Sequence, residues 1–317
     1  MNHLPYNSND SYVKNNPEGN TDLIAFPKFK SRNLMSQIRE GFTICNKSDV
    51  YHVEKILGKG SYGLVAMCRI NERDQRVALK VVSKEDVYSA KIEKEAILQL
   101  RKFDPDQFNI MNCFDCFEFE GDFCFAFELL DRSLADFMEE RHWAPLKVSE
   151  IRAIAKQLLV SLTALEEVKM THTDIKLDNL MLVDHTSTPF KVKLIDFGLT
   201  HFTSDLHESV ILQAPGYRAP EVFLGLLPNE AVDIWGLGVS LGELYLGQMV
   251  FSEKIEREIL RSAVGLLGQP DKFVLDRACR ATHYFTLHDT DSEITWKIKP
   301  ARKHKRTSGE RDGKETN

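Results

Sequence analysis

The chain of 317 residues carries a net charge of −6, and 43% of its residues are hydrophobic and 28% charged. These values are ordinary for a globular protein, and they give no global electrostatic reason to expect a nucleic acid or a membrane as a partner. The length is sufficient for one sizeable domain with extensions.

Residues 1–50 are rich in Asn, Ser, Lys and Pro and contain only short apolar islands. Such a composition does not bury enough apolar surface to fold by itself. We therefore predict a mostly flexible extension over these residues, without the basic and apolar regions of a secretory signal peptide. A folded domain is expected to begin at residue 51.

Residues 51–70 have the pattern of two strands joined by the turn Gly58-Lys59-Gly60-Ser61-Tyr62-Gly63. The same glycine pattern opens a helix in dinucleotide-binding domains, but here a strand follows it. Glycines let such a hairpin lie close to phosphate oxygens, and Lys80 on the next strand, 77–82, can pair with them. We expect these residues to bind a nucleoside triphosphate. The side chains expected to face its base are Val65 and Ala78.

A helix is predicted over residues 88–100, and it should carry the carboxylate that pairs with Lys80. The candidates are Glu93 and Glu95. The residue four positions after Glu93 is an isoleucine, whereas the residue four positions after Glu95 is a glutamine. Because residues four apart share a helix face, Glu93 is predicted to face the core and Glu95 the solvent.

Residues 108–127 are predicted to form two strands, which lead into Phe127-Glu128-Leu129-Leu130. We expect this last segment to link a small sheet-rich lobe to a helical one. The backbone groups of Glu128 and Leu130 are predicted to hold an adenine ring. Cys113 and Cys116 lie in the first strand, and without a second cysteine pair we interpret them as buried thiols and not as a zinc or redox site.

Two predicted helices, at 133–140 and from Ser149 onward, lead to the run His172-Thr173-Asp174-Ile175-Lys176-Leu177-Asp178-Asn179. The pattern H-x-D-x-K-x-x-N is typical of phosphoryl transfer. In this chemistry Asp174 accepts a hydroxyl proton, Lys176 offsets charge on the moving phosphoryl group, and Asn179 holds a magnesium ion. Asp196, in the run Asp196-Phe197-Gly198, would hold the metal from the other side.

The residues around this loop complete the predicted site. Met181, on the strand that follows, should close the adenine pocket from below. Residues 199–218 are expected to form a surface segment that presents the substrate. Asp233 opens a long apolar helix and is predicted to bind the backbone of the loop at His172. Asp233 and Glu243 also argue against a membrane span, because charges are costly inside a bilayer.

Taken in order, these motifs resemble those of eukaryotic protein kinases over residues 51–300. Four segments are similar to the homeodomain-interacting protein kinases: 127–134, 181–184, 217–221 and 288–292. The resemblance implies an α+β, two-lobed fold, with a β-sheet N-lobe (51–128) that carries one regulatory helix and a mainly helical C-lobe (129–300). It also implies ATP and Mg²⁺ as cofactors, transfer of phosphate to Ser or Thr of proteins, transcription regulators as partners, and a nuclear or cytoplasmic location.

The chain departs from the family pattern at three regulatory positions. Thr173 occupies the position of an arginine that commonly grips a phosphorylated activation segment. Ile211 and Pro215 stand where similar kinases carry a tyrosine and an arginine. Since the phosphate acceptor and its countercharges are missing together, we predict that the activity requires no phosphotyrosine in this segment.

The C-lobe is predicted to be shortened, with C-terminal helices missing, because the sequence becomes polar and basic from about residue 300. An arginine that would pair with Glu221 has no visible candidate. Residues 301–317 form a basic polar tail, whose cluster at 302–306 is either a nuclear-import patch or a solvated tail; we expect no direct nucleic-acid or membrane binding.

Two functions remain open at this point. The first is an ATP-dependent serine/threonine protein kinase, which the metal and phosphate ligands favour. The second is an interaction module that binds ATP with little or no turnover, which the shortened lobe favours.

Overall fold

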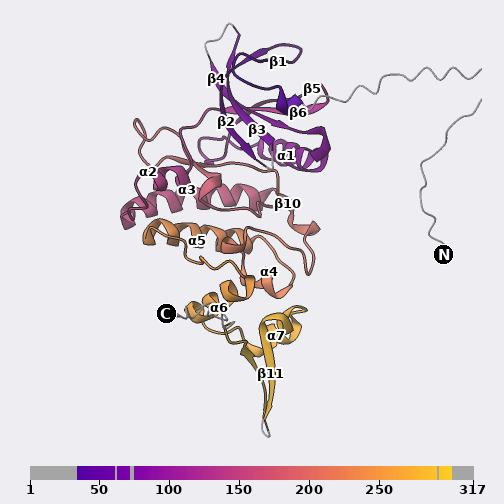
Figure 1. Cartoon of the computed structure of the whole chain (residues 1–317), viewed down its shortest axis with the longest axis vertical. Coiled ribbons are helices and arrows are strands. Elements are labelled where there is room, and N and C mark those ends of the chain that lie inside the picture. Colours follow the sequence, from indigo (N-terminus) through magenta and orange to yellow (C-terminus); the bar gives the residue numbers. More distant parts are fainter. Residues whose placement is uncertain (1–33, 61–62, 72–74, 291–292, 302–317) are drawn as a thin grey trace, which may run out of the picture. The chain divides into compact units, whose positions relative to one another are not determined.

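The structure, a computed structural model, describes residues 34–60, 63–71, 75–290 and 293–301. The strands of the largest sheet lie in the first part of the chain, and most helices lie in the second (Figure 1). This order of elements produces the predicted α+β fold, in which the strands form an N-lobe and the helices a C-lobe.

The N-lobe is an antiparallel six-stranded sheet with the order β1-β2-β3-β4-β6-β5. Its strands are β1 (Thr43–Cys45), β2 (Val50–Gly60), β3 (Gly63–Ile70), β4 (Arg76–Val82), β5 (Cys113–Phe119) and β6 (Asp122–Glu128). Leu64, Ala66 and Cys68 are buried at every second position of β3, as a strand with one face on a core requires. At the start of β3, a Cβ on Gly63 would lie 2.3 Å from the carbonyl oxygen of Val81, so only glycine fits there.

Residues 34–50 correct the prediction of a flexible extension. They contain the 3₁₀ helix η1 (Leu34–Ser36) and strand β1, which pairs with β2. Leu34, Ile38 and Ile44 are buried in the same cluster as the sheet residues. The short apolar islands are therefore part of the N-lobe core, and the prediction was wrong for this part of the chain. Residues 1–33 lie outside the described ranges.

Helix α1 (Val87–Leu100) carries an apolar face with a single carboxylate in it. The buried residues of α1 are Ser89, Ala90, Glu93, Ala96, Ile97 and Leu100. Their spacing of three or four places them on one side of the helix. The short η2 (Lys84–Asp86) precedes α1 and is capped by the side chain of Ser83, which accepts a hydrogen bond from the backbone N–H of Glu85.

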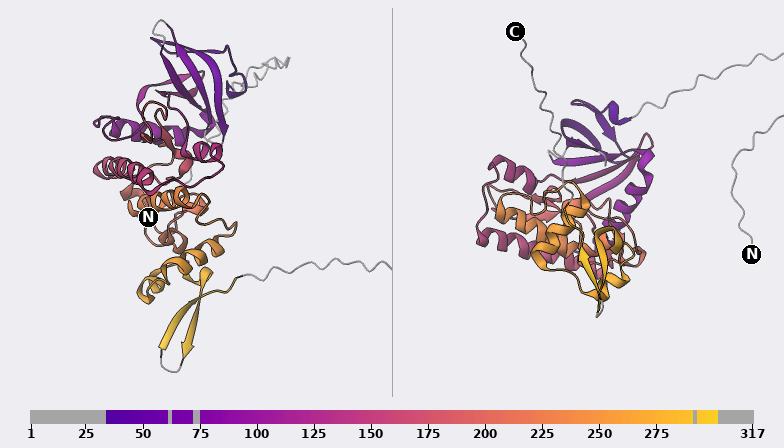
Figure 2. Two further views of the ribbon diagram at one scale, coloured as in Figure 1. Left: turned by 90° about the vertical axis from the view of Figure 1, so that its left-hand side faces the viewer. Right: turned by 60° about the horizontal axis from the view of Figure 1, so that its bottom comes forward.

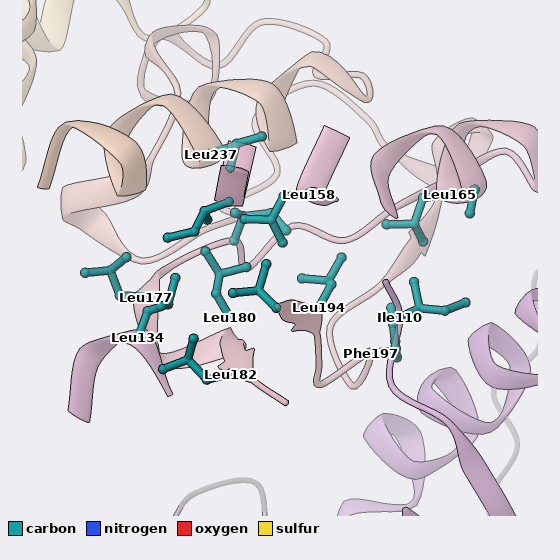
Figure 3. Close-up of a cluster of buried hydrophobic side chains, with 14 of the residues drawn as sticks. Ile110, Leu134, Leu158, Leu165, Leu177, Leu180, Leu182, Leu194, Phe197 and Leu237 are labelled. Carbon is teal, nitrogen blue, oxygen red and sulfur yellow. The ribbon is translucent and has the colours of Figure 1, made fainter. Parts of the chain in front are cut away.

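The C-lobe core forms between α3 (Val148–Glu167), α5 (Ala231–Leu246) and the short strands between them. Leu158 and Leu165 of α3 pack in one cluster with Leu237 of α5 (Figure 3). Helix α3 begins at Val148, one residue before the predicted start at Ser149. The remaining elements of this region are α2 (Leu134–Glu140), β7 (Met170–Thr171), η3 (Leu177–Asn179), β8 (Leu180–Leu182), β9 (Val192–Leu194), β10 (His201–Phe202) and η4 (Thr203–Asp205).

The chain after α5 forms short helices and then a hairpin that projects from them (Figure 2). These last elements, with the two that precede α5, are η5 (Pro215–Tyr217), α4 (Pro220–Leu224), α6 (Glu256–Leu267), α7 (Lys272–Arg277), α8 (Ala281–Tyr284), β11 (Phe285–Thr290) and β12 (Glu293–Ile298). Within the described residues, helix therefore ends at Tyr284, well before the predicted lobe boundary at 300. No helix in the described ranges is both long and apolar enough to cross a membrane.

Candidate active site

A cavity of about 360 Å³ lies between the N-lobe sheet and the start of the C-lobe. Of the predicted site residues, the cavity is lined by Gly58, Lys59, Gly60, Gly63, Val65, Ala78, Lys80, Glu93, Glu128, Leu130, Met181 and Asp196. Ser61 and Tyr62, also predicted to bind the nucleotide, lie outside the described residues. The structure thus brings residues as far apart in the sequence as Leu57 and Asp196 around one cavity that is large enough for a small-molecule ligand.

The cavity is also lined by Phe127 and Leu129 of the expected linker segment, and by three residues that were not predicted: Leu57, Met111 and Ile195. Leu57 directly precedes the first glycine of the turn, and Ile195 directly precedes Asp196, so adjacency could have indicated both. Met111 lies in the loop between α1 and β5 and has no local pattern that points to a site. Only the tertiary fold places it beside the cavity.

The side chain of Glu128 anchors the linker while its backbone lines the cavity. Its carboxylate accepts hydrogen bonds from the Nζ of Lys193, at 2.7 and 2.9 Å, and from the backbone N–H of Asn112 at 2.6 Å. The lysine side chain is only 1% exposed and also lies 2.6 Å from Asp106. These contacts of the buried lysine tie the linker at the end of β6 to β9.

Lys80, Glu93 and Asp196 form a charged group at the deep end of the cavity. The Nζ of Lys80 lies 2.8 Å from the carboxylate of Glu93 and 2.8 Å from that of Asp196. Glu95 lies on the exposed side of α1, where it accepts a hydrogen bond from Gln99 at 2.7 Å. The structure therefore places Glu93, and not Glu95, against the lysine, as the helical spacing predicts.

Burial and neighbouring charges shift the pKa values of these groups in opposite directions. Burial raises the pKa of Glu93 to about 7, against the opposing effect of Lys80. Burial alone would lower the pKa of Lys80, but the carboxylates of Glu93 and Asp196 raise it to about 12. Although burial opposes it, the Lys80 ammonium lowers the pKa of Asp196. The lysine stays charged and Asp196 stays ionised.

The loop at residues 172–179 is held in place by Asp233 at the start of α5. The two carboxylate oxygens of Asp233 accept hydrogen bonds from the backbone N–H groups of His172, at 2.6 Å, and Thr173, at 2.8 Å. Thr173 has a φ of +64°, which is strained for a β-branched residue. These bonds confirm the predicted role of Asp233, and they stabilise the strained backbone conformation of the loop at Thr173.

Asp174 is the centre of this loop. Its Oδ2 accepts hydrogen bonds from the Nζ of Lys176 at 2.9 Å and from the Nδ2 of Asn179 at 2.9 Å. The same Nδ2 also donates to the backbone carbonyl of Asp174 at 2.8 Å. Because Asn179 makes these bonds through its nitrogen, its amide oxygen is left for a cation. An amide oxygen and the ionised carboxylate of Asp196 are ligands that suit Mg²⁺.

The segment that follows Gly198 is bonded to the same scaffold. The hydroxyl of Thr173 donates to the backbone carbonyl of Leu199 at 2.6 Å. Further along, the hydroxyl of Tyr217 donates to the buried carboxylate of Glu243 on α5. Both ends of the predicted substrate-presenting segment are therefore attached to elements of the C-lobe core.

Comparison with known proteins identifies the family. The sequence profile described as protein kinase domain matches residues 51–277. The chain belongs to the protein kinase family. This result and the two lobes confirm the fold predicted from the sequence.

Curated relatives of this kinase include homeodomain-interacting protein kinases. Homeodomain-interacting protein kinase 2 of Mesocricetus auratus is 32% identical over 276 residues, which are 86% of this chain and 24% of the relative. Homeodomain-interacting protein kinase 4 of Homo sapiens is 35% identical over 263 residues, 81% of this chain and 42% of the relative. Homeodomain-interacting protein kinase 1 of Caenorhabditis elegans is 34% identical over 237 residues, 74% of this chain and 28% of the relative. The kinase chain thus spans about a quarter to two fifths of the length of these relatives.

In protein kinases, the arrangement of Lys80, Glu93 and Asp196 relates to catalysis. Catalysis by protein kinases requires the strand lysine to be paired with the helix glutamate and the aspartate before Phe-Gly to be in place. In this kinase the pair Lys80–Glu93 is formed, and Asp196 lies within 2.8 Å of the same lysine.

The partner of Glu221 remains absent among the described residues. Its half-buried carboxylate forms no ion pair there, and burial raises its pKa. Arg280 lies beside α4, where its backbone N–H donates to the carbonyl of Leu224 at 3.0 Å, but its guanidinium lies 3.8 Å from Glu256 instead. An arginine candidate near Glu221 therefore exists, although its charge is directed to another carboxylate.

Proposed function

We propose that this kinase transfers the γ-phosphate of ATP to serine or threonine hydroxyl groups of proteins. The observation that supports it most is the position of Asp174, which Lys176 and Asn179 both contact at 2.9 Å. A carboxylate so fixed is ready to accept a proton without rearrangement. The formed pair Lys80–Glu93, which lines the cavity, adds to this support.

The cavity provides the groups that ATP requires. The adenine ring would lie between Val65 and Ala78 above and Met181 below, against the backbone of Glu128 and Leu130. Gly58 and Gly60 leave open space where a side chain would stand, so their backbone can approach the phosphates. Lys80 would pair with the phosphate oxygens.

Two residues would hold magnesium, Asn179 and Asp196. When bound, Mg²⁺ would neutralise negative charge on the phosphates. The carboxylate of Asp196 is kept ionised by Lys80, as a metal ligand needs to be.

The chemical step needs a base and a stabilising charge. Asp174 orients the substrate hydroxyl and takes its proton as the oxygen attacks the γ-phosphorus, and the bond to the ADP oxygen breaks. Lys176, which lies 2.9 Å from Asp174, offsets the negative charge that spreads over the moving phosphoryl group. A lysine two positions after the aspartate also favours Ser/Thr over Tyr as the acceptor.

The names of the relatives suggest the class of partner. They are described as interacting with homeodomain proteins, so we propose transcription regulators as substrates and the nucleus as the site of action. The alternative of a binding module without turnover is less supported, because Lys80 and Asp196 line one cavity and Asn179 contacts Asp174.

Replacing the base tests the assignment. Asp174→Asn should lower kcat by about 10²- to 10⁴-fold, because the amide cannot take the proton. Turnover is measured with a serine-containing peptide, and the shift in melting temperature with ATP is the control, since it should survive in the variant. A variant that phosphorylates as fast as the parent would show that Asp174 is not the base.

A further inference from the structure

Arg218 carries a buried positive charge at the end of the substrate-presenting segment. Arg218 directly precedes Ala219-Pro220-Glu221, and its side chain is 6% exposed. The Nε donates to the backbone carbonyl of Leu212 at 2.8 Å, and the Nη2 donates to the carbonyl of Gln213 at 3.1 Å. The guanidinium also lies over the ring of Phe223, at 5.2 Å from its centroid. One arginine therefore fixes the backbone of the segment at two successive residues.

The backbone that Arg218 holds is strained. Gln213 has a φ of +64°, in the left-handed region that residues with a side chain seldom adopt. Its side-chain amide donates to the carbonyl of Val232 at 2.8 Å and accepts from the N–H of Ala219 at 2.9 Å. The turn thus depends on bonds from both Gln213 itself and Arg218.

The charge of Arg218 is balanced by Glu256, the first residue of α6. One carboxylate oxygen forms an ion pair with Nη1 of the arginine. The other accepts a hydrogen bond from the hydroxyl of Tyr284 at 3.4 Å and lies 3.8 Å from Nη2 of Arg280. The N-terminal end of a 12-residue helix also favours a negative side chain at this position. The carboxylate of Glu256 thus forms ion pairs with two arginines, Arg218 at the end of the segment and Arg280.

We propose that Glu256 is a positioning residue for the protein substrate and takes the place of a phosphate group. In kinases that are switched on by phosphorylation, a phosphorylated side chain orders this segment by pairing with arginines. Here a carboxylate from another helix already occupies the guanidinium of Arg218, and the segment carries Ile211 in place of a tyrosine. The segment at 212–218 is consequently held in its strained form in the unmodified chain.

The proposal rests on the proposed kinase function, and it concerns substrate binding and not the chemical step. Glu256 contacts neither the cavity residues nor Asp174; it acts through Arg218 on the peptide-binding backbone. Loss of its charge should therefore weaken the binding of a protein substrate and leave the binding of ATP intact.

Glu256→Gln removes the charge and keeps the size of the side chain. We expect the KM for myelin basic protein to rise about tenfold, since a charge-assisted bond becomes a weaker neutral one, and the KM for ATP to stay within about twofold. The matched control is Glu258→Gln on the same helix, which should keep the KM values of the parent. Loss of folded protein alone would lower kcat and leave the KM for the protein substrate unchanged.

Hydrogen exchange provides a readout that does not depend on activity. In phosphatase-treated protein, the backbone amides of residues 212–218 should exchange faster in Glu256→Gln than in the parent or in Glu258→Gln. If the parent transfers no phosphate, the proposed function fails, and this measurement still tests the role of Glu256. The proposal is overturned if exchange in the segment and the KM for the protein substrate are both unchanged, or if the parent is active only after its segment is phosphorylated.

Discussion

Single residues in the site carry charges that burial and neighbouring groups hold in defined states. Glu93 is fully buried against Lys80, and its pKa is raised to about 7. Between the ordinary value for glutamate of about 4.3 and this raised value, the folded chain binds a proton that the unfolded chain has released. The contribution of Glu93 to stability is therefore complete at low pH and is lost as the pH rises through about 7.

Glu93→Gln should remove this pH dependence. Because glutamine does not ionise, only the parent should lose stability from this group as the pH rises. The melting temperature of the variant minus that of the parent should therefore increase from pH 5 to pH 7.5, although the variant has lost its bond to Lys80. Melting curves at several pH values measure this difference, with Glu95→Gln on the exposed side of α1 as the control. A difference between Glu93→Gln and the parent that is the same at every pH would contradict the raised pKa.

At the scale of elements, the linker between the lobes depends on one lysine. Lys193 of β9 joins Glu128 at the end of β6 and Asp106 in the loop before β5. Lys193→Met should lower the free energy of unfolding by about 3 kcal/mol, because it leaves the carboxylate of Glu128 without its cation. Thermal or denaturant unfolding measures the loss.

The double variant Glu128→Gln/Lys193→Met provides the control for this prediction. It removes both charges, so it should recover part of the stability lost in the single variant. If the two single substitutions and the double one show additive effects, the ion pair does not stabilise the linker.

The sequence predicted elements well where a pattern repeats within one element. Helix periodicity identified the face of α1 that carries Glu93, and the strand pattern that follows the glycine turn identified β3. Residues 34–50 were missed because their few apolar side chains become a core only when β1 pairs with β2. Met111 and the bridge through Lys193 were missed for the same reason, since both depend on contacts between residues far apart in the chain. The role of Glu256 likewise required the approach of α6 to Arg218, which no local pattern encodes.

At the scale of the whole molecule, the chain combines the motifs of a protein kinase with a C-lobe whose last described helix ends at Tyr284. The predicted phosphate residue Lys80 and the predicted metal ligand Asp196 line one cavity, and the pair Lys80–Glu93 is formed without any modification. Thr173, Ile211 and Pro215 leave no sign of a phosphotyrosine switch, and Glu256 balances the remaining arginine. We therefore expect an enzyme that is active as synthesised.

The most direct test of this account is a phosphotransfer assay on protein that has been treated with phosphatase and confirmed by mass spectrometry to carry no phosphate. The protein is incubated with radiolabelled ATP, Mg²⁺ and myelin basic protein, and the phosphoamino acids are separated. The account predicts label in phosphoserine and phosphothreonine, and none with Asp174→Asn. A shift in melting temperature with ATP but no transfer of label, or label in phosphotyrosine, would contradict it.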